Sequence, residues 1–179
     1  TMAVLGVFVR SFFISGKRVM IMFGFKKNVD SNIYAPADGR LIALEDVPDQ
    51  VFASKVLGDG AAIEVTGEEI CAPCDGRLVM LADTKHAFGI SADNGVEVLV
   101  HIGLDTVEFN GTGFTALKAV NDRVKKGTPI IRLDREFFQS QNACLITPVL
   151  ISNSAGCPFT PETTGKEVVA GESVVIRFQ

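Results

Sequence analysis

The sequence predicts an all-β domain of mostly antiparallel strands, and three observations lead to this fold class. Short Val- and Ile-rich runs alternate with Gly and Asp-Gly punctuation along most of the chain. The composition includes 13 Phe and 17 Gly, with one Tyr and no Trp. A chain of 179 residues that is 47% apolar can bury one sizeable core. We therefore expect a β-sandwich or small barrel with few, short helices.

The apolar opening segment is predicted to be an N-terminal extension, residues 1–28, ahead of one domain over residues 29–179. Three basic residues divide it into apolar runs shorter than the roughly 18 to 20 residues that a membrane span requires. These residues are Arg10, Lys17 and Arg18. The extension is disordered, forms an amphipathic helix on an anionic membrane surface, or is a leader or artificial addition ahead of a natural start near Met20 or Met22.

An internal repeat organises the predicted domain. The segment IYAPADGRLIAL, which starts at Ile33, returns 37 positions later as ICAPCDGRLVML, with eight of twelve positions identical. Two copies indicate a duplicated domain and not a solenoid. Each copy carries an Asp-Gly pair, which signals a tight turn because Gly accepts a positive φ without a Cβ clash.

The C-terminal part of the chain predicts a second pair of similar pieces. The segment VKKGTPIIRL, from Val124, is echoed by VVAGESVVIRF, from Val168. In each segment a turn at Gly127 or Gly171 is followed by an apolar strand. Between them, the segment around Arg135 to Asn142 is the one place where a short helix is expected.

The two histidines of the chain, His86 and His101, flank a predicted hairpin. A two-residue turn at Asn94-Gly95 places Phe88 opposite His101 and puts both histidines on one face, with backbones about 7 to 8 Å apart. A turn shifted by one residue, at Asp93-Asn94, pairs the two histidines directly. A three-residue loop instead sends them to opposite faces.

Strand alternation indicates which face of the second strand carries His101. The apolar side consists of Val96, Val98, Val100 and Ile102. His101 therefore points away from the main core, on the side of Glu97 and Leu99. Phe88 faces it in the expected register and frames an apolar surface patch of the kind that docks another protein.

This pair of histidines suits phosphoryl transfer. A neutral imidazole is a competent nucleophile near pH 7, because its pKa of about 6.5 leaves a nitrogen lone pair free. The transfer mainly requires a positioned nucleophile and donors for the equatorial oxygens. We expect His101 to accept the phosphoryl group and His86 to stabilise it. Thr84, on the strand face of His86, is expected to fix a ring tautomer, and Asp105 either orients a ring, repels an unwanted anion, or is an ordinary loop acid.

The charge distribution limits the possible partners, and the cysteines limit the possible cellular compartment. Five of the 17 basic residues precede the first acidic residue, Asp30, so the remainder carries 12 basic and 21 acidic residues. An acidic domain argues against nucleic acid as a ligand and favours a basic protein partner. No disulfide framework behind a signal peptide is evident among the four cysteines, so we expect a reducing, cytoplasmic location.

Three other functions are weighed against this one. His101 and Asp105 have the H-x-x-x-D form of some zinc peptidases, but catalytic zinc usually takes three protein ligands and the chain has no third histidine. A biotinyl-type carrier needs an exposed lysine framed by methionines, which is absent. A purely regulatory binding domain stays open. Cys71 and Cys74 have a redox or zinc spacing, yet the internal repeat indicates ordinary small apolar positions.

Several separated motifs, in order, resemble the glucose-type IIA family of the bacterial phosphotransferase system. They are VPDQVFASKVLGDGAAIEVTG, TKHAFGI, GVEVLVHIGLDTVEFNGTGF and LITPVLISN. The resemblance runs from about Ile33 to the C-terminus, and the basic, apolar extension and the four cysteines depart from it. It implies an antiparallel β-sandwich or barrel with a duplicated hybrid motif.

The resemblance also implies roles for individual residues and partners. His101 would form a phosphohistidine with phosphate from the small histidine phosphocarrier protein, HPr, and pass it to a cysteine of a IIB domain and then to sugar. His86 and Thr84 match the family's second histidine and its threonine, while Phe52, Asp49 and Asp105 match positions around the depression that docks partners. No cofactor is required, although in some members the two histidines also bind zinc at a partner interface. Membrane contact is expected only through the permease or the extension.

Overall fold

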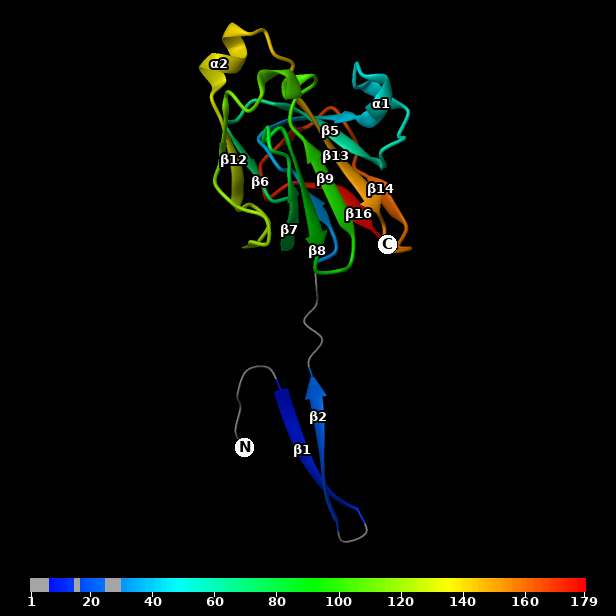
Figure 1. Ribbon diagram of the computed structural model, residues 1–179. Helices are drawn as coiled ribbons and strands as arrows, with labels where there is room; N and C mark the ends of the chain where they lie inside the picture. The colour runs from blue at the N-terminus through cyan, green and yellow to red at the C-terminus, as the bar shows by residue number, and fades with distance from the viewer. Residues whose placement is uncertain (1–6, 15–16, 25–29) are drawn as a thin grey trace.

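Antiparallel strands make up almost all of the regular structure in this computed structural model, which describes residues 7–14, 17–24 and 30–179 (Figure 1). In these residues there are two short helices, α1 (Gln50–Ala53) and α2 (Arg135–Ser140). Two 3-10 turns cover Leu44–Asp46 and Thr106–Phe109. The predicted all-β fold with few short helices is therefore confirmed. No helix in the described residues is long and apolar enough to cross a membrane.

Eight strands form one large antiparallel sheet in the order β11-β7-β8-β9-β13-β5-β4-β15. In this order they span Arg123–Val124, Gly76–Leu81, Ala87–Ala92, Glu97–His101, Ile146–Asn153, Asp59–Val65, Gly39–Ala43 and Glu167–Val168. Strands β9 and β13 lie at the centre of the sheet and pair with each other. Strand β9 is therefore paired with both β8 and β13 up to Val100, and its last residue, His101, is paired with Ala87 of β8.

Two three-stranded sheets accompany the large sheet, with the orders β10-β12-β6 and β14-β16-β3. Their strands are Phe114–Ala116, Pro129–Leu133 and Glu69–Cys71 in the first, and Phe159–Pro161, Val174–Phe178 and Ile33–Tyr34 in the second. The first copy of the sequence repeat supplies β3 and β4, and the second copy supplies β6 and β7. The two echoed C-terminal segments supply β11 with β12 and β15 with β16. The repeats therefore fold into equivalent halves, as the sequence predicts.

The two halves also bond to each other through equivalent backbone groups. Tyr34 N donates to Pro73 O at 2.8 Å, and Cys71 N donates to Pro36 O at 2.6 Å. The echoed turns meet as well, because a Cβ added at Gly171 would lie 2.5 Å from the Cα of Gly127. The repeated segments therefore serve as the joint between the halves.

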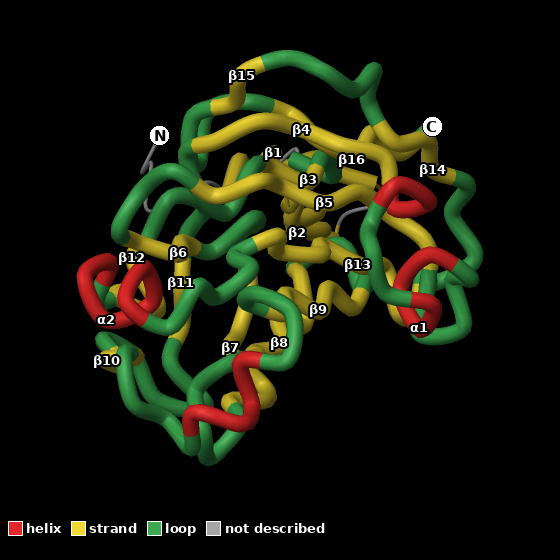
Figure 2. Tube along the Cα trace, turned by 90° about the horizontal axis from the view of Figure 1, so that it is seen from above, coloured by secondary structure: helices red, strands yellow, loops and turns green. Residues whose placement is uncertain are grey.

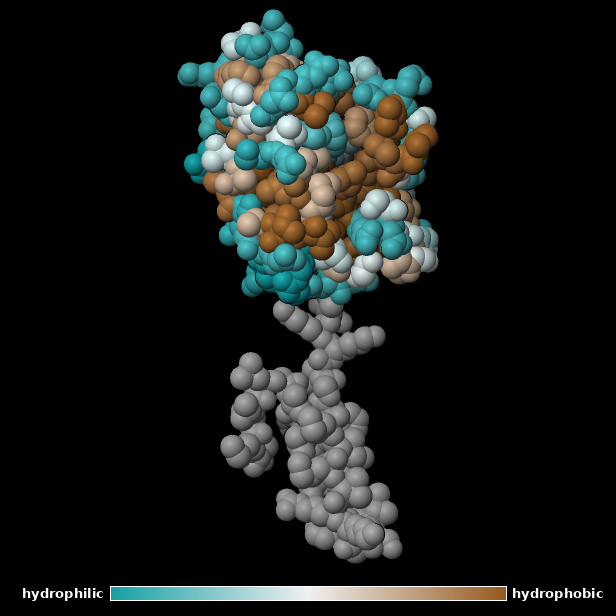
Figure 3. Space-filling model, in the orientation of Figure 1, coloured by the Kyte–Doolittle hydropathy of each residue, from teal (hydrophilic) through white to brown (hydrophobic). Residues whose placement is uncertain are grey.

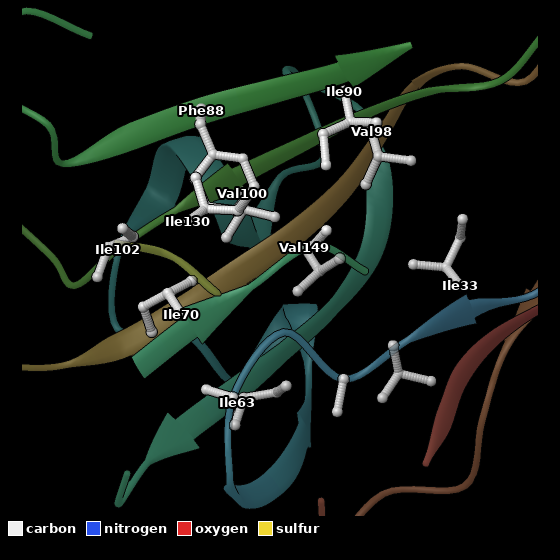
Figure 4. Close-up of a cluster of buried hydrophobic side chains, with 14 of the residues drawn as sticks. Ile33, Ile63, Ile70, Phe88, Ile90, Val98, Val100, Ile102, Ile130 and Val149 are labelled. Carbon is white, nitrogen blue, oxygen red and sulfur yellow. The ribbon is translucent and has the colours of Figure 1, made fainter. Parts of the chain in front are cut away.

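The main core lies between the large sheet and the two small ones. Figure 4 shows Phe88 and Val100 together with isoleucines and valines from several strands. Phe88, Ile90, Val98 and Val100 are at most 2% exposed. Strands β8 and β9 thus turn these side chains inward, which leaves the opposite face of β9 for the site.

Both short helices are capped by an aspartate and lie at the end of the molecule where β9 terminates (Figure 1). Figure 2 shows α2 beside β12 and α1 on the other side of the domain. The predicted helix at 135–142 is confirmed as α2, while α1 was not predicted. Its sequence signal is Asp49, whose Oδ1 accepts a hydrogen bond of 2.7 Å from Val51 N.

The described part of the predicted N-terminal extension is an antiparallel pair of strands, β1 (Val7–Ile14) and β2 (Lys17–Gly24). An amphipathic helix is therefore the wrong expectation for these residues. The aromatic and β-branched runs in both segments favour strands over helix, which explains the difference. Residues 1–6, 15–16 and 25–29 of the extension lie outside the described residues, and the boundary at residue 28 stays a prediction.

We expect Gly76→Ala to destabilise the protein, because a Cβ there would lie 2.4 Å from the carbonyl oxygen of Ser91 on the paired strand. Such overpacking costs roughly 1 to 3 kcal/mol. Urea unfolding measures the loss. Gly67→Ala is the matched control, because a Cβ at Gly67 makes its nearest contact at 3.4 Å. Equal stability of the two variants would contradict the close approach of β7 and β8.

Candidate active site

His101 is the last residue of β9 and lies on the face of the strand that points away from the main core. Val98 and Val100 alternate with it and are buried, whereas Leu99 and His101 are half-buried. The alternation predicted from the sequence therefore holds for this strand. Strand β9 terminates at the end of the molecule that also carries α1 and α2 (Figure 1), so the half-buried His101 lies at this end.

The register of the hairpin differs from the preferred expectation. Its loop has three residues, Asp93 to Gly95, because Ala92 N donates to Val96 O at 2.8 Å. Gly95 takes the left-handed conformation, with φ of 89°, as in hairpins where a turn is followed by a bulge residue. His101 is therefore opposite Ala87, and Phe88 is opposite Val100.

This register makes the predicted docking role of Phe88 wrong. Its side chain is fully buried in the main core, beside Val100 (Figure 4). The Asn94-Gly95 pair suggested a two-residue turn, and the extra loop residue shifts every pairing by one position. A shift of one position moves a side chain to the other face of the sheet. Phe88 accordingly stabilises the fold and has no surface with which to contact a partner.

His86 nevertheless reaches His101, although a three-residue loop was expected to separate the two rings. His86 lies just before β8 and follows Lys85, whose φ is 59°. His86 lies outside the regular strand, which begins at Ala87, so strand alternation does not fix the direction of its ring. The two ring centroids are 4.9 Å apart with an interplanar angle of 73°. Ile102 N donates to His86 O at 2.7 Å and joins the two segments.

Each imidazole has a hydrogen-bond partner at Nδ1. His101 Nδ1 lies 2.9 Å from the carbonyl oxygen of Gly103, and His86 Nδ1 lies 2.6 Å from the hydroxyl of Thr84. A carbonyl oxygen can only accept, so His101 Nδ1 must carry the proton and Nε2 keeps its lone pair. The Thr84 hydroxyl therefore contacts the ring of His86, as the two-residue spacing between them predicted.

Phe52 forms the apolar wall of the site. Its ring centroid lies 5.0 Å from that of His101, and the side chain is 5% exposed. It belongs to a second buried cluster, separate from the main core, made of Leu44, Val47, Phe52, Ala62, Leu104 and Leu150. The cap by Asp49 orders the first turn of α1, the helix that carries Phe52. Sequence periodicity could not find this wall, because α1 has four residues.

Both histidines have a pKa below the ordinary value of 6.5. Burial is the main cause at His101, and the neighbouring His86 lowers that pKa further, while the bond to Gly103 and the carboxylates of Asp49 and Asp105 act in the opposite direction. Burial also lowers the pKa of His86. Both rings are consequently neutral at pH 7, which is the form that a nucleophile requires.

A pocket of about 370 Å³ has an acidic rim and shares Asp49 and Asp105 with the surroundings of His101, although neither histidine lines it. Its lining includes Asp49, Asp105 and Glu108, with Leu104 and Phe109 as apolar members. Asp105 adopts a left-handed conformation, with φ of 57°, directly before the Thr106–Phe109 turn. Asp49 and Asp105 therefore lie close enough to His101 to influence its charge, while their role in docking partners stays a prediction. Glu108 is a further acidic residue of this rim, which the sequence did not indicate.

The described residues contain no group of three or more His, Cys, Asp or Glu side chains placed to hold a metal ion. The H-x-x-x-D pattern thus lacks the three protein ligands that catalytic zinc takes. Cys71 and Cys74 are buried, and burial raises the pKa of Cys71 to about 11 and that of Cys74 to about 12. These thiols stay protonated at neutral pH, as expected for ordinary repeat positions.

Comparison with known proteins gives one consistent result. Residues 31–157 match the family described as phosphoenolpyruvate-dependent sugar phosphotransferase system, EIIA 1. A glucose-specific EIIA component of Staphylococcus epidermidis is 43% identical over 157 residues, which cover 87% of this chain and 95% of the relative. One from Haemophilus influenzae is 42% identical over 160 residues, with coverages of 88% and 96%. The solved glucose permease IIA of Mycoplasma capricolum aligns with a TM-score of 0.74 and 37% identity, over 87% of this chain and 99% of that one.

The lowered histidine pKa values predict that stability falls as the pH falls below 6.5. The unfolded chain binds protons near that pH, whereas the folded rings resist them, so the unfolded state binds more protons and gains stability. The free energy of unfolding stops decreasing once the pH is below the pKa values of the two histidines in the folded protein. Urea unfolding across this pH range should show that the free energy of unfolding depends less steeply on pH in a variant carrying both His86→Gln and His101→Gln than in the wild type. An equally steep dependence in the variant would contradict the shifts.

Proposed function

Because this chain belongs to the EIIA 1 family of the phosphoenolpyruvate-dependent sugar phosphotransferase system, we propose that His101 carries its phosphoryl group. The chain is a phosphotransferase component that acts as a phosphocarrier in sugar transport. One observation carries the assignment to His101. Its Nδ1 is held by the Gly103 carbonyl, so its Nε2 is a free nucleophile beside a second imidazole.

The proposed reaction consists of two displacements at phosphorus. In the first, Nε2 of His101 attacks the phosphoryl group of a phosphohistidine on HPr, the new N–P bond forms, and the imidazole of the donor leaves with the electron pair of the broken bond. In the second, a cysteine thiolate of a IIB domain attacks the same phosphorus, and the His101 ring is restored. Neither displacement requires a cofactor, because phosphoryl transfer depends mainly on positioning and charge stabilisation.

His86 is proposed to stabilise the transferring group. If the Thr84 hydroxyl donates to Nδ1 of His86, the proton of this neutral ring lies on Nε2 and can be donated to an equatorial phosphoryl oxygen. The 4.9 Å separation of the two ring centroids supports a shared phosphoryl group between them. Thr84 thereby sets the tautomer of the stabilising ring, while Gly103 sets that of the nucleophile.

The surface around the histidines suits basic protein partners with an apolar contact area. Phe52 and Leu99 border His101, and Val51, Val56 and Leu57 of the α1 region are exposed. Figure 3 shows apolar residues gathered over this face of the domain. The acidic rim of Asp49, Asp105 and Glu108 would meet Lys or Arg on the partner. We propose HPr and a IIB domain as the two partners of this surface, with the exposed Val51, Val56 and Leu57 as its apolar contacts. Phe52, which was expected to contact partners, is buried like Phe88 and instead supports this surface from below.

Four further assignments belong to the same proposal. The protein acts in the cytoplasm, where the proposed donor and acceptor meet, and the same surface can bind regulatory proteins. Zinc is compatible with the pair of His86 and His101 only where a partner supplies further ligands, because two ligands leave the usual tetrahedral shell incomplete. Glucose is the sugar named for the relatives, and it is the sugar to assay first.

We expect phosphoenolpyruvate, enzyme I and HPr to add one acid-labile phosphoryl group to the wild type and none to His101→Gln, as measured by intact mass spectrometry. His86→Gln should still accept the group but transfer it to a IIB domain roughly 10² to 10³ times more slowly, since one stabilising donor is lost. Circular dichroism of each variant controls for folding. A phosphoryl group on folded His101→Gln, or none on the folded wild type, would sink the proposal.

A further inference from the structure

Two threonines converge on the loop that follows His101. Thr106 and Thr147 are the buried polar side chains of residues 30–179, and each is 0% exposed. They come from different parts of the fold, the 3-10 turn after β9 and the strand β13. A buried hydroxyl costs free energy unless it is hydrogen-bonded, so the bonds that these two side chains make identify what they hold.

Both hydroxyls bond to the same peptide group. Thr106 Oγ1 donates to the carbonyl oxygen of Ile102 at 2.5 Å, and Thr147 Oγ1 accepts from Gly103 N at 3.4 Å. The Ile102 carbonyl and the Gly103 N–H are the two ends of a single planar unit. Thr147 also donates to the Leu145 carbonyl at 3.1 Å, which fixes the direction of its hydroxyl. The Ile102–Gly103 peptide is thus clamped at both ends.

The next peptide group carries the carbonyl that faces His101. Its N–H, from Leu104, donates to Cys144 O at 2.9 Å, and its carbonyl, from Gly103, lies 2.9 Å from His101 Nδ1. Gly103 joins the two peptide planes with φ of 74°. A Cβ at Gly103 would lie 2.4 Å from Thr106 Cγ2, so the same threonine that clamps the first plane also requires glycine between the planes.

We propose that Thr106 and Thr147 are positioning residues that aim the Gly103 carbonyl at His101 Nδ1 and so keep Nε2 as the phosphoryl acceptor. The inference rests on the proposed function of His101. Without the clamp, the first plane is free to rotate, the carbonyl leaves the ring, and the proton can move to Nε2. An Nε2 that carries a proton has no lone pair with which to attack phosphorus. Neither threonine touches the phosphoryl group.

The test reads the tautomer of His101 directly, from long-range proton–nitrogen NMR correlations of the imidazole in the alkaline range where the ring is neutral. The wild type should hold its proton on Nδ1. Thr106→Val and Thr147→Val keep the shape of the side chain and remove the hydroxyl, and each should shift the ring toward the Nε2–H tautomer. The rate of phosphorylation by HPr should fall roughly tenfold. Thr106→Ser and Thr147→Ser restore the hydroxyl and should restore both readouts.

Val175→Ala controls for destabilisation alone, because Val175 is 0% exposed and belongs to β16, in another sheet. It should lower the free energy of unfolding and leave the tautomer unchanged. An unchanged tautomer in both folded valine variants would overturn the proposal. If the valine variants do not fold, a wild-type ring with its proton on Nε2, or serine variants with a shifted tautomer, would overturn it equally. If the tautomers are as expected but the wild type is not phosphorylated, the proposed function would be rejected, whereas the positioning role of the two threonines would be retained.

Discussion

The hydrogen bond between His101 Nδ1 and the Gly103 carbonyl is the interaction on which the rest of the site depends. An imidazole that is buried beside Phe52 and His86 is neutral, because burial lowers its pKa. Neutrality alone does not make it a directed nucleophile, since a neutral ring can place its proton on either nitrogen. The 2.9 Å hydrogen bond to the Gly103 carbonyl places the proton on Nδ1. It leaves the lone pair of the neutral ring on Nε2.

The duplicated fold supplies the rigidity that this bond needs. Strand β9 ends at His101 between β8 and β13, in the middle of an eight-stranded sheet. Strand β9 is paired on both sides up to Val100, and His101 is paired with Ala87 of β8, so the backbone that leads to the ring has little freedom to move. The loop beyond it is tied to β13 through Thr147 and to the segment before β13 through Cys144. The stable part of the fold thus holds His101, the proposed nucleophile, while the acidic rim and α1 form the border of the proposed docking surface.

Much of the fold and the choice of histidines could be predicted from the sequence, because both rest on local patterns. The twelve-residue repeat predicted the equivalent strand pairs, and alternation in β9 predicted that His101 points away from the core. Features set by the geometry of loops could not be predicted. The ring of His86, just before β8, lies beside that of His101, and a three-residue loop buries Phe88. The four-residue helix that carries Phe52 is too short for periodicity to reveal. Thr106 and Thr147 bond to the same peptide group only because β13 lies beside β9.

The most direct test of this account is to identify the nitrogen that becomes phosphorylated. Protein labelled with nitrogen-15 in its histidines can be phosphorylated and examined for the one-bond phosphorus–nitrogen coupling. The account predicts this coupling at Nε2 of His101, with Nδ1 still protonated and bonded to Gly103. A coupling at Nδ1 of His101, or at either nitrogen of His86, would contradict it.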